Sequence, residues 1–138
     1  MVVIETDFLI ALISKGDKHH SEVKEILEKL SKALLSPYSF IELDLLINSG
    51  VLKVKPSDFY RALANVLTYY GVFVPRIKPG HLMRAWDLRN RYNLTFFDSL
   101  HAAVAIEESE VLMSYDRVYS IVKELKYLHP RDFLANFS

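Results

Sequence analysis

Several residue types that would indicate a particular class of protein are missing or scarce in this chain of 138 residues. Cysteine is absent, which excludes a disulfide framework and any metal site with thiolate ligands. Glycine and proline number only four and five, and no linker or low-complexity stretch interrupts the chain. Half of the residues are hydrophobic, so we predict one domain with a sizeable core over residues 1–138.

An excess of charge of one sign is also missing. The 17 basic and 17 acidic residues balance, so any binding to a polyanion requires a local basic patch. No apolar run approaches the ~20 residues of a membrane helix. The N-terminus, Met-Val-Val-Ile-Glu-Thr-Asp, lacks the basic region and apolar stretch of a secretory signal. We therefore expect a cytoplasmic protein without a membrane segment.

Short apolar runs alternate with longer segments of helical periodicity along the chain. Strands are predicted at 2–4, 33–36, 72–74, 111–113 and 127–128. Helices are predicted at 8–13, 20–30, 39–48, 56–70, 79–92 and 99–108, with a short one after 116 and a turn at 130. This alternation predicts a three-layer α/β/α fold with a central parallel sheet of four to five strands.

Acidic residues follow the predicted strands or open the helices after them. Glu5 ends the first strand, and Asp7 follows two residues later. Glu42 and Asp98 each lie in the first turn of a helix, and Asp116 comes just after the strand 111–113. In open parallel sheets the crevice lies beyond the carboxyl ends of the strands. If the strands are adjacent, these carboxylates gather at one edge of the sheet.

Such a cluster of carboxylates requires a cation. At ~4 Å and an effective dielectric constant near 20, each like-charged pair costs roughly 4 kcal/mol. Oxygen ligands without cysteine or paired histidine favour Mg²⁺ or Mn²⁺ over Zn²⁺. One or two such ions activate a water molecule and stabilise charge on a phosphodiester. The pattern therefore favours a divalent metal site that acts on phosphodiesters.

Each acid also has a purely structural interpretation. Ser39-x-x-Glu42 and Thr95-x-x-Asp98 both fit a capping box, and this interpretation is favoured for either acid taken alone. Asp116 alone is an ordinary acid at a helix start. Glu5 is harder to explain structurally, because it interrupts a β-branched run. The repetition of acids at several strand ends favours the functional interpretation.

The acids lie in four short blocks. In chain order these are Val-Val-Ile-Glu5-Thr6-Asp7, Ser-Phe-Ile-Glu42-Leu, Phe-Phe-Asp98-Ser-Leu-His-Ala-Ala and Leu-Met-Ser114-Tyr-Asp116. Together they resemble the motifs of PIN-domain nucleases, and within that family the VapC-type toxin ribonucleases of toxin–antitoxin pairs. The resemblance covers nearly the whole chain. One position departs from the pattern: the first acid of the family is normally Asp, and Glu5 stands there.

The resemblance implies an endoribonuclease that uses Mg²⁺ or Mn²⁺. Its catalytic acids would be Glu5, Glu42, Asp98 and Asp116. Its metal ligands would come from Glu5, Asp98, Asp116 and Asp7, with Thr6 and Ser114 supporting them by hydrogen bonds; Ser114 alone fits a turn residue equally well. An RNA substrate, a homodimer and a cognate antitoxin are implied as partners. The apolar helices at 40–47 and 59–70 would supply the protein-binding surface, unless they belong to the core.

The first block contains two candidate first ligands. Residues on alternate positions of a strand share a side only while the chain stays extended. The apolar run from Phe8 predicts instead that a helix starts at about Thr6 or Asp7. We therefore predict that Asp7 caps this helix and that Glu5 points into the crevice.

A basic segment precedes Asp98. It contains Arg76, Lys78, Arg84, Arg89 and Arg91 against one acid, Asp87. We predict that these residues bind the RNA backbone, with a solvated helix face as an equally weighted alternative. Aromatic residues at 92, 96 and 97 fit base stacking, but core packing is favoured. His101, three residues after Asp98, fits a buried structural role better than support of the site.

Two other functions fit parts of the sequence. Glu5 in place of Asp fits a catalytically weakened PIN-fold module that binds RNA or protein. Acids at strand ends also fit a small phosphotransfer or phosphatase domain. That class normally adds a lysine or a glycine-rich phosphate loop at these turns, and the sequence has neither.

Overall fold

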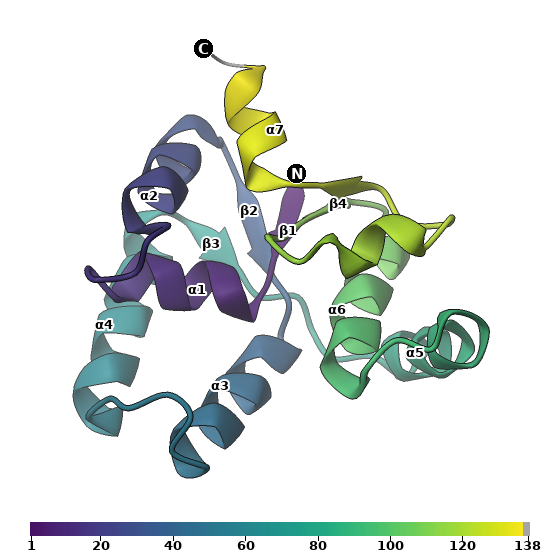
Figure 1. The fold of residues 1–138 in the computed structure, drawn as a ribbon, viewed down its shortest axis with the longest axis horizontal. Helices are drawn as coiled ribbons and strands as arrows, with labels where there is room; N and C mark the ends of the chain where they lie inside the picture. The colour runs from purple at the N-terminus through teal and green to yellow at the C-terminus, as the bar shows by residue number, and fades with distance from the viewer. Residues whose placement is uncertain (137–138) are drawn as a thin grey trace.

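A computed structural model describes residues 1–136 and contains a parallel sheet with helices on both faces (Figure 1). Its strands are β1 (Val2–Ile4), β2 (Ala33–Leu35), β3 (Val72–Phe73), β4 (Val111–Met113) and β5 (Tyr127–Leu128). Their order is β3-β2-β1-β4-β5, and every neighbouring pair is parallel. All five strands agree with the predicted positions. The last two residues of the predicted domain 1–138 lie outside the described residues.

The helices also follow the predicted pattern closely. They are α1 (Thr6–Ile13), α2 (His20–Lys29), α3 (Tyr38–Asn48), α4 (Pro56–Tyr69), α5 (Pro79–Tyr92), α6 (Phe96–Glu107), α7 (Pro130–Ala135) and a 3₁₀ helix η1 (Arg117–Ile121). Two predictions need correction. Helix α6 begins at Phe96 rather than at residue 99, because Thr95 already holds the extended N-cap position. The predicted turn at residue 130 is the helix α7, which starts with a proline at its first position.

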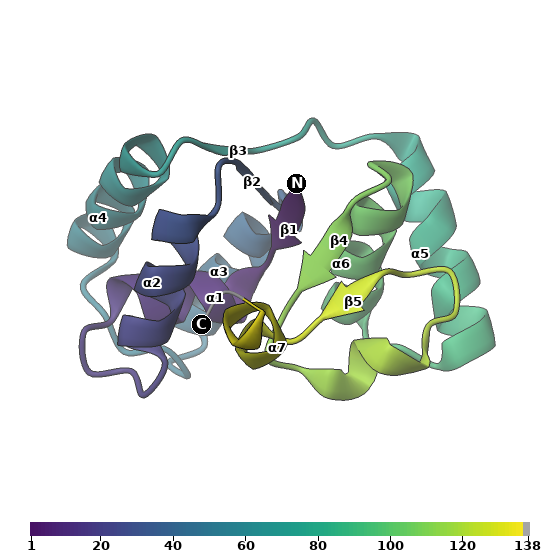
Figure 2. The same cartoon turned by 90° about the horizontal axis from the view of Figure 1, so that it is seen from above.

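Alternation along the short strands divides the core between two layers. Val2 and Ile4 belong to the cluster that includes α1, α2 and α4, whereas Val3 belongs to the cluster that includes α5 and α6. Figure 2 shows these two groups of helices on opposite sides of the sheet. The predicted three-layer α/β/α fold is confirmed. Across residues 1–136, no helix combines the length and apolar character needed to cross a bilayer.

The strand order determines where the acidic residues can meet. Strand β1 lies between β2 and β4 in parallel register, with Ile4 opposite both Leu35 and Met113. The residues that follow these three, Glu5, Ser36 and Ser114, therefore leave the sheet at one edge. Helices α1 and α3 start at this edge, and α3 packs against α6.

Candidate active site

Glu5 is the first acid beyond β1, and both of its carboxylate oxygens have partners. Its backbone is extended and forms the N-cap of α1, with Oε1 accepting from the backbone N–H of Asp7 at 2.8 Å. Oε2 accepts from the hydroxyl of Tyr119 at 3.0 Å. The residue is only 5% exposed. The prediction that Asp7 caps the helix is wrong, because α1 already starts at Thr6 and this makes Glu5 the capping residue.

Asp7 lies in the first turn of α1 and contacts the end of β4. Its Oδ2 accepts from Ser114 Oγ and from the backbone N–H of Tyr115, both at 3.3 Å. Its Oδ1 is buried, and no hydrogen-bond partner for it is found in residues 1–136. A buried carboxylate oxygen without a donor is costly, so this atom is a candidate for binding a cation.

Tyr119 is a site residue that the sequence did not reveal. It lies in η1 and is fully buried, and its hydroxyl is 3.0 Å from Glu5 Oε2 and 3.2 Å from Asp98 Oδ1. Burial raises the pKa of this hydroxyl, and the charges of Glu5 and Asp98 raise it further, so it stays protonated. Tyr119 therefore holds two of the predicted acids close together. Nothing in the motif around Asp116 distinguishes this tyrosine from a core residue.

Glu42 is positioned by side chains from two other helices. His101 of α6 is fully buried, with Nε2 2.8 Å from Glu42 Oε1 and Nδ1 2.7 Å from Ser36 Oγ. Thr6 also donates a short hydrogen bond to Glu42. Burial acts to raise the pKa of Glu42, but the hydrogen bonds from His101 and Thr6 outweigh it and lower the pKa. His101 thus combines the buried structural role with direct support of a predicted catalytic acid.

The capping-box interpretation of Glu42 and Asp98 is wrong, and so is the placement of Glu42 in a first helical turn, whereas Asp98 does lie in the first turn of α6. Helix α3 begins at Tyr38, so Ser39 lies inside it, and the Ser39 hydroxyl has no partner within residues 1–136. Thr95 is the N-cap of α6, but its side chain makes no capping hydrogen bond. Neither predicted capping box is formed.

Asp116 lies at the rim of this cluster. It is exposed, and its Oδ1 caps η1 by accepting from the backbone N–H of Val118 at 3.0 Å. Its own backbone N–H donates to Ser114 Oγ at 3.0 Å, and the same hydroxyl donates to Asp7. Ser114 therefore acts both as a strand-end turn residue and as the link between two of the predicted acids.

The electrostatics of the cluster disfavour an ionised Glu5. Burial raises its pKa well above that of an ordinary glutamate, and the neighbouring charges of Asp7 and Glu42 raise it further. A bound cation would reverse this effect. The donor set consists only of oxygen ligands, which fit a hard divalent ion such as Mg²⁺. In the described part of the chain, however, no three His, Asp or Glu side chains are arranged to hold a metal ion.

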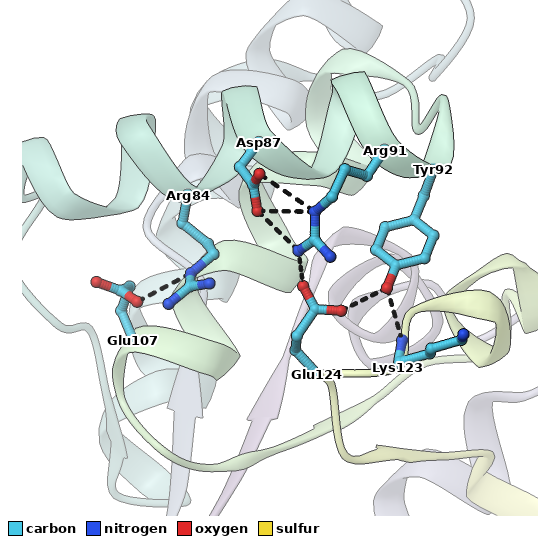
Figure 3. A network of polar contacts seen from close by, with 7 residues as sticks. All are labelled: Arg84, Asp87, Arg91, Tyr92, Glu107, Lys123 and Glu124. Atoms are coloured by element: carbon cyan, nitrogen blue, oxygen red, sulfur yellow. Dashed lines mark hydrogen bonds and ion pairs between the residues drawn. The ribbon is translucent and has the colours of Figure 1, made fainter.

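The predicted basic segment lies on α5 and in the loop before it, and most of its charge is paired with acids. The ion pairs are Lys78–Glu108, Arg84–Glu107, Arg91–Asp87 and Arg91–Glu124. Figure 3 shows how acids from α6 and from the segment after η1 reach the arginines of α5. Most of these acids are distant in sequence, so the local excess of positive charge is smaller than the sequence indicates.

Arg89 differs from these paired residues. Its Nε donates to Ser99 Oγ at 2.7 Å, and its guanidinium lies over the rings of Trp86 and Phe96. Within residues 1–136 neither Arg89 nor Arg76 has an ion-pair partner. Of the aromatic residues considered for base stacking, those at 92 and 97 pack partly buried against the core, as favoured. Phe96 instead is 57% exposed.

Comparisons with known proteins agree with this architecture. A sequence comparison with curated proteins finds no match. VapBC2 from Rickettsia felis, bound to a DNA fragment from its promoter, is similar in structure with a TM-score of 0.77. That likeness is at 17% identity and covers 94% of this chain and 98% of the other. The VapC20 toxin of Mycobacterium tuberculosis, which cleaves the sarcin–ricin loop, has a TM-score of 0.70 at 21% identity, covering 91% of this chain and 99% of the other.

A third similar structure is VapBC-1 from nontypeable Haemophilus influenzae, with a TM-score of 0.72 at 16% identity over 95% of this chain and 99% of the other. At these identities the structural likenesses establish the fold. The family is established by sequence, because the model of the PIN domain matches residues 2–125. This chain belongs to the PIN domain family.

Proposed function

We propose that the protein is a metal-dependent endoribonuclease and the toxin of a toxin–antitoxin pair. The observation that carries the proposal is the linked set of carboxylates at the carboxyl edge of a PIN-domain sheet. Tyr119 joins Glu5 to Asp98, and Thr6 contacts Glu42 beside the cap made by Glu5. Ser114 connects Asp7 with Asp116 at the rim.

In this proposal Glu5, Asp98 and Asp116 would be the principal ligands of Mg²⁺ or Mn²⁺, and Asp7 would be a lesser one. The ion would supply a nucleophile at neutral pH and stabilise charge on the phosphodiester. The surrounding residues orient the acids: Tyr119 holds the Glu5 and Asp98 carboxylates together. His101 and Thr6 keep Glu42 ionised, which suits it to orient an attacking water molecule by accepting a hydrogen bond from it.

The toxin assignment rests on the structural neighbours. VapBC2 from Rickettsia felis and a toxin–antitoxin complex from Klebsiella pneumoniae share this fold. We propose by analogy that a cognate antitoxin binds this chain and that the chain cuts RNA in the cytoplasm. Co-expression with the product of a neighbouring small reading frame, followed by co-purification, tests the partner.

Metal dependence is the first prediction. The purified chain should cleave single-stranded RNA in the presence of Mg²⁺ or Mn²⁺, and this cleavage should stop when EDTA is added. Asp98→Asn should lower the cleavage rate by at least about a hundredfold, because the substitution removes the negative charge of the side chain but keeps its shape. Cleavage is followed on a labelled RNA by gel electrophoresis.

A matched control uses Asp132→Asn, which changes an exposed acid in the first turn of α7 and should leave the rate unchanged. Cleavage that persists after exhaustive chelation would contradict the metal mechanism. If metal and RNA both bind without cleavage, the protein is instead a PIN-fold binding module. The engagement of both Glu5 oxygens by Asp7 and Tyr119 is the observation that favours this second function.

A further inference from the structure

We propose that Trp86, Arg89 and Phe96 form a stacking site for single-stranded RNA on α5 and on the first turn of α6, the helix that carries Asp98. The inference rests on the proposed ribonuclease function and adds residues that would hold the substrate strand. Of the five basic residues predicted to bind RNA, Arg89 is then the principal contact. We call these three side chains the stacking site.

The stacking site presents two exposed rings and one cation. Trp86 on α5 is 61% exposed, and Phe96 at the start of α6 is 57% exposed. The guanidinium carbon of Arg89 is 4.8 Å from the ring centroid of Trp86 and 4.7 Å from that of Phe96. These distances are within the range of cation–π attraction, so the three side chains form one stacked group across two helices.

Hydrogen bonds fix Arg89 within this group. Its Nε donates to Ser99 Oγ, and Ser99 Oγ donates to the carbonyl oxygen of Phe96, both at 2.7 Å. In the part of the chain that the structure describes, no carboxylate lies within ion-pair distance of Arg89. By contrast, Arg84 and Arg91 on the same helix are paired with acids (Figure 3). Arg89 is therefore an oriented cation whose charge is available to an anion.

Single-stranded RNA fits two exposed rings and an arginine unpaired within residues 1–136 better than a second copy of the chain does. Its unstacked bases pack on aromatic rings and on guanidinium planes, and its phosphates are attracted to a cation. A second copy of the chain would also cover the rings. It would then bury the charge of Arg89, which is unfavourable unless the partner supplies an acid.

The stacking site and Asp98 share the first turn of α6. Phe96 and Asp98 are two residues apart, a rise of about 3 Å along the helix axis, but their side chains leave the helix about 200° apart. A strand with one phosphate near Asp98 would therefore cross the N-terminus of α6 to place its neighbouring nucleotides on the stacking site. The site would position such a strand and favour single-stranded over duplex RNA, because its rings take unstacked bases.

Trp86 makes the experiment direct, because it is the only tryptophan of the chain. The intact protein is titrated in EDTA, which prevents cleavage, with single-stranded oligouridylate of about 12 nucleotides. We expect saturable quenching of the tryptophan fluorescence. Phe96→Ala and Arg89→Lys should each weaken binding about tenfold, since Lys keeps the charge but cannot stack.

Two control substitutions change exposed side chains outside the stacking site. Met83→Ala changes an exposed apolar side chain on α5, and Arg61→Ala changes an exposed arginine on α4. Both should bind the oligonucleotide as the unsubstituted chain does. Melting curves of the Phe96, Met83 and Arg61 variants should coincide, because these side chains are exposed, and Arg89→Lys is compared at a temperature where its own curve shows it folded.

The outcomes separate this inference from the proposed function. Equal RNA binding by Phe96→Ala, Arg89→Lys and the unsubstituted chain would overturn the stacking site even if RNA is cleaved. Tryptophan emission that changes with protein concentration but not on addition of RNA would also overturn the stacking site. That result would assign the surface to self-association of the chain. Quenching that the variants weaken, without cleavage in any metal, would support the stacking site and contradict the nuclease.

Discussion

At the scale of single residues, Glu5 has the most unusual surroundings among the acids. It is buried after a β-strand, caps a helix with one oxygen and accepts from Tyr119 with the other. The carboxylate of a shorter aspartate at this position would lie farther from Tyr119. The additional methylene of glutamate allows the carboxylate to contact both the helix N-terminus and η1.

The raised pKa of Glu5 predicts a pH-dependent stability in the absence of metal. Because the folded state holds the proton more tightly, the free energy of unfolding falls as pH rises above the ordinary glutamate pKa of about 4.3. It continues to fall until the pH passes the raised pKa, by about 1.4 kcal/mol per pH unit from this group. Glu5→Gln should remove this loss and make the metal-free protein more stable at pH 8.

Urea unfolding in EDTA between pH 5 and 8 measures this effect. Glu25→Gln, which changes an exposed acid of α2, is the matched control and should keep the slope of the unsubstituted chain. Identical slopes for the Glu5→Gln variant and the unsubstituted chain would contradict a raised pKa at Glu5.

A second prediction at this scale distinguishes Glu5 from Asp7. Glu5→Gln should lose Mn²⁺ binding and cleavage, whereas Glu5→Asp should retain activity. Asp7→Asn should leave cleavage nearly intact, since an amide oxygen can still accept from Ser114 and Tyr115. Calorimetric Mn²⁺ titrations and cleavage rates of the three variants are compared. If only the Asp7 variant is inactive, its unpartnered Oδ1 is the essential ligand atom.

At the scale of elements, helices α3 and α6 are joined through a polar contact in the interior. His101 of α6 bridges Glu42 of α3 and Ser36, the residue after β2. Buried polar groups of this kind need all their partners, because each one left without a hydrogen bond costs about 1–3 kcal/mol. The same contact that positions Glu42 therefore also stabilises the packing of the two helices.

His101→Ala should consequently lower both stability and the cleavage rate. We expect a loss of about 1–3 kcal/mol in the free energy of unfolding, because Glu42 and Ser36 lose a partner and a cavity forms. RNA cleavage at a temperature where the variant is folded should slow, because the Glu42 carboxylate loses its orientation. His20→Ala removes a half-buried histidine on α2 and should not change the cleavage rate. Equal cleavage rates for both variants would assign His101 to structure alone.

At the scale of the whole molecule, only part of the predicted protein-binding surface is exposed. Phe59 and Leu63 of α4 are buried, so that face of the helix belongs to the core. Ile41 and Leu45 of α3 are 55% and 53% exposed and lie one turn apart on the same face. The exposed apolar part of the predicted homodimer surface therefore lies mainly on α3, and Tyr69 at the end of α4 is also exposed.

The homodimer prediction can now be tested with one substitution. Light scattering of the purified chain should give the mass of a dimer, and Leu45→Lys should give a monomer, because a charge would be buried without a partner. Val51→Lys, at an exposed apolar residue in the loop after α3, should remain dimeric. A monomer at high concentration for the unsubstituted chain would contradict the prediction.

The sequence by itself determined the elements and the chemistry at their ends. Periodicity located every strand and nearly every helix, since burial of one face or both faces requires apolar residues at regular spacing. The acids at residues 5, 42, 98 and 116 stand out because they follow a strand or lie near the start of a helix, and because their four blocks together resemble the PIN-domain motifs. A parallel sheet then placed several of them at one edge without any knowledge of distances.

Only the tertiary structure decided which side chains meet. Strand order brought Glu5 and Asp7 beside Ser114, and η1 placed Tyr119 between two acids that are distant in sequence. The same long-range packing neutralised most of the basic segment with acids from α6 and beyond, and left Arg89 unpaired among the described residues. These contacts join residues distant in the chain, and no local pattern encodes them, because they depend on how whole elements pack in space.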